Sequence, residues 1–87
     1  LGSDHPDVAT VLNNLGSVYH DQGQYDKALL HYSEALAIQQ KALGSDHPDV
    51  ATALNNLGSV YHDQGQYDKA LSHFRDALAI RQKALGS

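Results

Sequence analysis

Residues 15–38 read LGSVYHDQGQYDKALLHYSEALAI and predict two helices joined by a short turn. Apolar residues recur every three or four positions on both sides of Gln22-Gly23-Gln24, a spacing that indicates helices rather than strands. The apolar pattern stops at this tripeptide, and Gly23 is the kind of residue that commonly ends a helix. This stretch therefore predicts a helical hairpin.

The residues before this stretch predict where the first helix begins. Pro6 suits the first helical position, where a missing N–H costs no hydrogen bond, and the residue before it, His5, is expected to cap the helix. Asp7 adds a negative charge in the first turn, where the helix dipole favours it. We therefore expect helices over about residues 6–22 and 25–43.

The whole chain consists of two copies of this hairpin. Residues 43–84 align with residues 1–42 without a gap, so a second pair of helices is expected over about residues 48–64 and 67–85, and residues 85–87 restart the motif. The copies differ only at Val11/Ala53, Leu30/Ser72, Tyr32/Phe74, Ser33/Arg75, Glu34/Asp76 and Gln39/Arg81. We expect an all-α fold, an α-hairpin solenoid of two helix-turn-helix repeats. A duplication within a longer array, a designed chain and an excised fragment would all account for such similar copies.

Several positions in each copy resemble the motif of the tetratricopeptide repeat family. The first helix carries Leu-Gly-x-x-Tyr and the second carries Ala-x-x-x-aromatic-x-x-Ala, as is typical of that family. Gly16 and Ala28 are small because the two helices must approach closely there, and the two tyrosines fill the space beside them. The packing positions that carry the resemblance are Leu15, Gly16, Tyr19, Ala28, Tyr32 and Ala35, with Leu57, Gly58, Tyr61, Ala70, Phe74 and Ala77 in the second copy.

The chain also departs from the commonest form of that family. A leucine, Leu12 or Leu54, stands where a tryptophan is usual, and a glutamine, Gln40 or Gln82, stands where a proline is usual. The unit is also longer than the common form of about 34 residues. In this respect it is similar to the repeats of kinesin light chains. The resemblance implies a right-handed superhelix whose concave face, lined by the first helix of each repeat, binds peptides.

Polar residues of the two first helices are the binding residues that this resemblance implies. They remain on an exposed helix face once the apolar stripe is assigned to packing. Consecutive asparagines are unfavourable inside a helix, and an amide offers both a donor and an acceptor to the backbone of an extended peptide. The alternative is that an asparagine bridges neighbouring helices or faces water. The candidate residues are Thr10, Asn13, Asn14, Ser17, His20 and Asp21, with Thr52, Asn55, Asn56, Ser59, His62 and Asp63 in the second copy.

The charge pattern restricts the expected partner. Neither first helix contains a lysine or an arginine, so a cationic clamp for a terminal carboxylate is not expected. A bound peptide should be neutral or basic rather than an acidic C-terminus. The net charge of −4 argues against nucleic acid as a partner.

The sequence does not indicate an enzyme, a metal site or a cofactor. There is no cysteine, and none of the six histidines has a second histidine three or four residues away, as a metal-binding pair on one helix would need. Neither a serine nucleophile elbow nor a phosphate-binding loop is present. No apolar run approaches the roughly 20 residues that span a bilayer, and no secretory leader is found. We therefore expect no membrane partner and, by default, a cytoplasmic location.

A second function is open, in which the chain is a structural unit that stacks on itself. Two repeats form only one interface between neighbours, and neither end carries a polar capping helix. Such uncapped ends predict homo-oligomers, formed either head-to-tail or by exchange of helices. At one end, Val8, Val11 and Leu15 are prepared for a preceding unit. At the other end, a following unit would cover much of the apolar set Tyr67, Ala70, Leu71, Phe74, Ala77, Leu78, Ile80 and Leu85.

Overall fold

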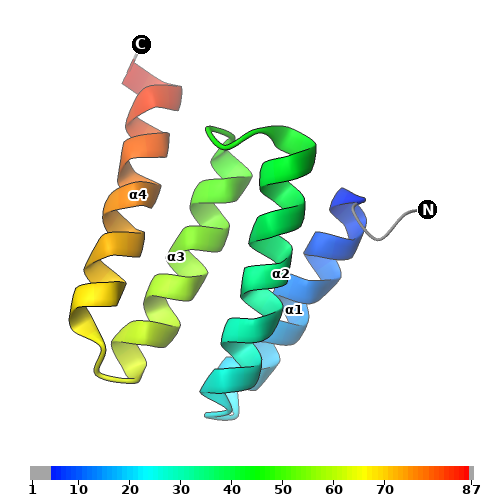
Figure 1. Cartoon of the computed structure of the whole chain (residues 1–87), viewed down its shortest axis with the longest axis vertical. Coiled ribbons are helices and arrows are strands. Elements are labelled where there is room, and N and C mark those ends of the chain that lie inside the picture. The colour runs from blue at the N-terminus through cyan, green and yellow to red at the C-terminus, as the bar shows by residue number, and fades with distance from the viewer. Residues whose placement is uncertain (1–4, 87) are drawn as a thin grey trace.

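The computed structural model describes residues 5–86, which form four α-helices and no strand. They are α1 (Pro6–Asp21), α2 (Tyr25–Leu43), α3 (Pro48–Asp63) and α4 (Tyr67–Gly86), arranged as two consecutive hairpins (Figure 1). The prediction of an all-α fold built from two helical hairpins is confirmed. The expectations that concern residues 1–4 and 87 lie outside the described residues.

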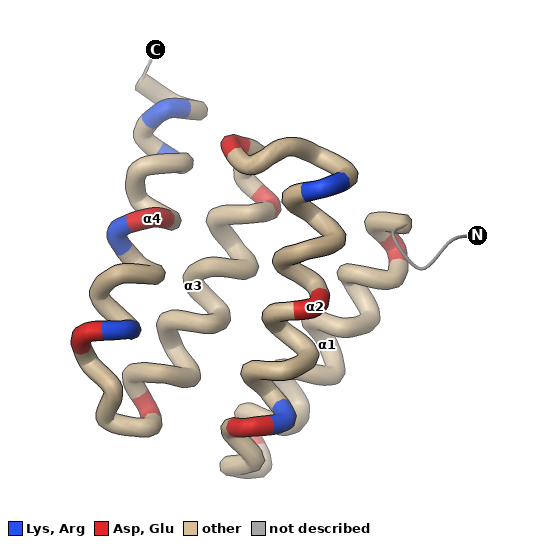
Figure 2. Tube along the Cα trace, in the orientation of Figure 1, with Lys and Arg blue, Asp and Glu red and all other residues tan. Residues whose placement is uncertain are grey.

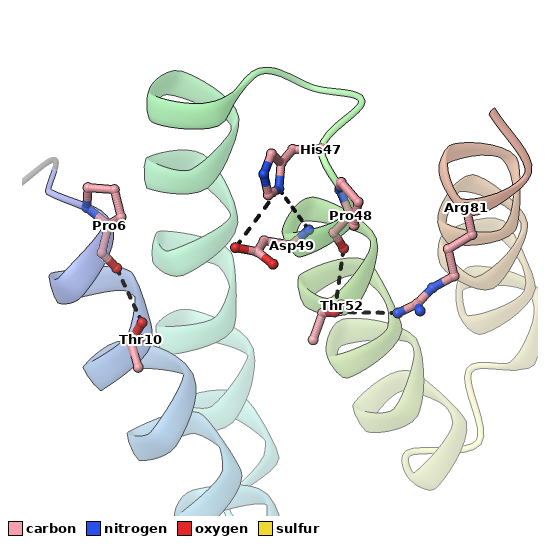
Figure 3. A network of polar contacts seen from close by, with 7 residues as sticks. All are labelled: Pro6, Thr10, His47, Pro48, Asp49, Thr52 and Arg81. Atoms are coloured by element: carbon pink, nitrogen blue, oxygen red, sulfur yellow. Dashed lines mark hydrogen bonds and ion pairs between the residues drawn. The ribbon is translucent and has the colours of Figure 1, made fainter. Parts of the chain in front are cut away.

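Local interactions account for the helix ends. The Nδ1 atom of His5 accepts a hydrogen bond of 3.1 Å from the backbone N–H of Asp7, and His47 caps α3 in the same way. Figure 3 shows the second of these caps beside Pro48. At the other end of α1, Gly23 has a φ angle of 75°, in the left-handed region that favours glycine. Both the histidine cap and the terminating glycine were predicted from the sequence and are confirmed.

Each hairpin is held together by a glycine beneath an aromatic ring. A Cβ atom added to Gly16 would lie 2.7 Å from Cδ1 of Tyr32, and one added to Gly58 would lie 2.7 Å from Cε1 of Phe74. Contacts this short do not occur between real Cβ atoms and ring carbons, so any larger residue would displace the ring. The aromatic ring therefore packs directly on the backbone of the facing helix.

The two hairpins stack because α3 packs on α2 as well as on α4. Ala28 and Tyr32 of the first hairpin form a buried cluster with Leu57 and Val60 of the second. Within residues 5–86, the backbones of α1 and α3 also approach each other closely, whereas those of α2 and α4 do not. We therefore call the exposed side of α1 and α3 the inner face, since equivalent helices of the two repeats lie closer together there than at α2 and α4.

At the ends of the stack, one expectation about packing is wrong. Leu15, which was expected both to pack within its hairpin and to be left for a neighbour, is 40% exposed, whereas its equivalent Leu57 is 3% exposed. The difference arises because α2 covers this side of α3, while no described helix covers the same side of α1. We use the names α1 face and α4 face for two sets of exposed apolar residues, one on each terminal helix. The α1 face comprises Val11, Leu15 and Val18, and the α4 face comprises Tyr67, Leu71 and Leu78.

Candidate protein-binding surfaces

The polar residues selected from the sequence occupy α1 and α3 at different depths. None of them is fully buried, so the inner face is a shallow surface and not a deep cleft. The exposed residues are Thr10, Asn14, Ser17, Asp21, Thr52, His62 and Asp63, and the half-buried ones are Asn13, His20, Asn55, Asn56 and Ser59.

A depression of about 210 Å³ between α1 and α3 brings several of these residues together, and we call it the amide pocket. Its floor includes Gln39 of α2, which is 8% exposed. The side-chain oxygens of Gln39 and Asn13 are buried, and neither has a hydrogen-bond partner among the described residues. The pocket is lined by Thr10, Asn13, Asn14, Gln39, Asp49 and Thr52.

Gln39 and Asp49 were not among the residues predicted for this surface. A signal for Gln39 was present, because it follows the buried residues Tyr32 and Ala35 at helical spacing and is a polar residue within that stripe. No comparable signal marks Asp49. Its contribution depends on how closely the start of α3 approaches α1 in the stack.

A carboxylate joins the two repeats at the opposite end of the inner face. The Nε2 atom of His20 lies 2.5 Å from Oδ2 of Asp63, and the Nδ1 atom of His62 lies 3.4 Å from Oδ1 of the same carboxylate. The hydrogen bond from His20, followed by that from His62, holds the pKa of Asp63 below its usual value. The structure thus places the carboxylate of Asp63 between the two histidines.

Charge is unevenly distributed between the inner face and the other helices. Figure 2 shows that α1 and α3 carry carboxylates near their ends and neither lysine nor arginine. A cation nevertheless reaches this region from α4, because Nη2 of Arg81 donates a 3.4 Å hydrogen bond to Oγ1 of Thr52 (Figure 3). Arg81 occupies the position that Gln39 holds in the first copy.

The described residues provide neither a metal site nor a membrane span. Within residues 5–86, no three His, Cys, Asp or Glu side chains gather closely enough to hold a metal ion. No helix in the same range is both long and apolar enough to cross a bilayer.

Comparisons with known proteins agree with this architecture. A family model described as "Tetratricopeptide repeat" matches residues 7–83. The crystal structure of BtubC (BKLC) from P. vanneervenii is similar, with a TM-score of 0.82, 36% sequence identity and 92% of this chain covered. The chain spans about a third of that protein's length, since 32% of it is covered. No curated protein was found to match the chain in sequence.

Proposed function

The chain belongs to the tetratricopeptide repeat family, and from this premise we propose that it is a non-enzymatic scaffold that binds a peptide or protein segment along the inner face. Proteins of this family generally mediate contacts between proteins. We propose a neutral or basic segment as the partner, because carboxylates mark the ends of α1 and α3 and neither helix carries a cationic side chain.

The observation that carries this proposal is the amide pocket. It combines the asparagine pair of α1 with residues of α2 and α3, so the stacking of the two repeats creates a polar surface that one hairpin lacks. Side-chain amides can donate to and accept from a peptide backbone, which suits an extended ligand of varied sequence.

A random peptide library selected on the intact chain tests this proposal. A variant in which four asparagines are replaced together should bind the selected peptides about tenfold or more weakly, since several hydrogen bonds are lost. Its substitutions are Asn13→Ala, Asn14→Ala, Asn55→Ala and Asn56→Ala. A matched control replaces Gln22, Gln24, Gln64 and Gln66 by alanine, which removes the same number of amides at the turns. The proposal is wrong if the asparagine variant binds every selected peptide as tightly as the original chain does.

A second function, head-to-tail stacking of copies, is favoured by a different observation. The α4 face repeats the residues with which α2 contacts the buried clusters between the hairpins, since Tyr25, Leu29 and Leu36 pack against those clusters. The α1 face likewise repeats most of what α3 presents to α2, with Val11 in place of Ala53. The α4 face of one molecule therefore matches the α1 face of another in the way that α2 matches α3 within the chain.

Sedimentation equilibrium over a range of concentrations tests the stacking function. We expect the mean molar mass to rise with concentration, and the double substitution Leu71→Glu and Leu78→Glu to return it to that of a monomer. The control is Leu30→Glu, because Leu30 is exposed but belongs to neither terminal face. A constant monomer mass, or an equal effect of the control, would exclude stacking through these faces.

A further inference from the structure

We propose that the amide pocket binds a positively charged ammonium or guanidinium group, supplied by a lysine or arginine side chain of the bound segment. This inference rests on the proposed function, because the pocket lies on the inner face. It goes further by naming which part of a ligand occupies this position and by which atoms it is held.

The two buried amide oxygens carry the inference. Gln39 and Asn13 both line the pocket, and Gln39 is more than nine-tenths buried. The Oε1 atom of Gln39 and the Oδ1 atom of Asn13 are buried and have no hydrogen-bond partner among the described residues. A buried acceptor that lacks a donor is unfavourable, so a ligand that brings several N–H groups gains more here than on an exposed surface. An ammonium offers three such donors and a guanidinium offers five.

The rim of the pocket also consists of acceptors. The hydroxyl of Thr10 donates to the backbone oxygen of Pro6 at 3.4 Å, and that of Thr52 donates to Pro48 at 3.5 Å, which directs both hydroxyl protons into their own helices. The Thr52 oxygen already accepts one hydrogen bond from Arg81, and the remaining lone pairs of the two hydroxyls are available to a donor. Asp49 adds a carboxylate, which Figure 3 shows on the side of α3 away from Arg81.

The size of the pocket favours a side chain over a free small molecule. Its volume of about 210 Å³ lies below the range of roughly 300–1,000 Å³ that is typical of small-molecule sites. A charged head group on a flexible stem fits such a depression while the rest of the peptide lies along the inner face.

Arg81 gives an internal precedent for this recognition. Its guanidinium already donates to the hydroxyl of Thr52 at 3.4 Å, from the opposite side of α3 (Figure 3). The same contact places a like charge close to the proposed ligand. Replacing Arg81 by glutamine, the residue of the first copy, should therefore strengthen binding of a cation.

The test compares two short acetylated and amidated alanine peptides that carry either lysine or its uncharged analogue norleucine at the centre. Titration of the ¹⁵N-labelled chain, followed by NMR, should show saturable shifts of the side-chain amides of Asn13 and Gln39 with the lysine peptide alone. Asn14→Asp should tighten binding about fivefold, as expected for one added charge near the surface. Asn56→Asp, the same change in the second copy, is the matched control and should have a smaller effect.

Two further variants separate binding from folding. Gln39→Leu should weaken binding of the lysine peptide at least fivefold. Gln40→Leu, at an exposed neighbouring position on α2, should leave binding unchanged. Equal binding of the lysine and norleucine peptides, or unchanged binding by Asn14→Asp, would overturn the inference. The proposed function fails separately, when the peptide library yields no ligand that depends on the asparagines.

Discussion

Asp63 of the second repeat accepts a hydrogen bond from His20 of the first, with 2.5 Å between Oδ2 and Nε2, and it accepts another from the neighbouring His62. One carboxylate thus joins a helix of each repeat at the exposed edge of their interface. Because the contact spans the two hairpins, it reports on their stacking and not on the folding of either hairpin alone.

This contact predicts how stability depends on pH. The two histidines lower the pKa of Asp63 in the folded chain, so the unfolded chain binds a proton at this carboxyl more readily. The stabilisation is fully present above the unfolded pKa of about 3.9 and is lost as the pH falls through the lower folded pKa. In Asp63→Asn, the free energy of unfolding should therefore fall less steeply at acid pH than it does in the original chain. Urea unfolding at several pH values measures this slope. Asp21→Asn, the equivalent change on α1, should keep the original slope.

Because Gly16 lies beneath the ring of Tyr32, we expect even the addition of one methyl group at this position to lower the stability of the chain. Gly16→Ala should destabilise the chain by about 1–3 kcal/mol, because the new Cβ would displace the buried ring, although alanine is the better helix former. Gly86→Ala is the control, since a Cβ at Gly86 meets no atom within 4 Å. Urea unfolding measures both changes, and equal stability of the two variants would contradict the close packing of Gly16 on Tyr32.

Leu57 and Leu15 occupy the same position in the two copies but differ in burial. Leu57→Ala should lower the free energy of unfolding by about 2–5 kcal/mol, as is usual for a buried leucine. Leu15→Ala should lower it by well under half as much in a dilute monomer. Measuring both variants by urea unfolding at low and high protein concentration adds a test of stacking. A cost for Leu15→Ala that grows with concentration would indicate that another molecule covers the α1 face.

Gln39 predicts a substitution that stabilises the chain. Gln39→Leu removes a buried oxygen that has no partner among the described residues. The leucine that replaces the glutamine is apolar and of similar size. We expect thermal and urea unfolding to show a gain of about 1 kcal/mol. Gln40→Leu should change stability by less than about 0.5 kcal/mol, as is usual for an exposed site. A loss of stability in Gln39→Leu would mean that the amide forms a hydrogen bond within the fold.

The features predicted from sequence are those that depend on neighbouring residues in the chain or on the repeat itself. The cap at His5 and the helix end at Gly23 arise within a few residues, and the match to the tetratricopeptide model confirms the family indicated by the repeated motifs. The exposure of Leu15 and the approach of Arg81 to Thr52 depend on which helix lies alongside. The sequence does not reveal such differences, because Leu15 and Leu57 are the same residue in different surroundings. The replacement of Gln39 by Arg81 in the second copy does not by itself show which residue the arginine reaches.

The backbones of α1 and α3 approach each other closely whereas those of α2 and α4 do not, and this has a mechanical consequence. Straightening the stack moves α2 and α4 towards each other across the wider of the two separations. Bending it further in the other direction presses α1 against α3 at once. The stiffness of the chain should therefore differ between the two directions of bending, so that a segment bound across the inner face meets a surface that widens more easily than it narrows.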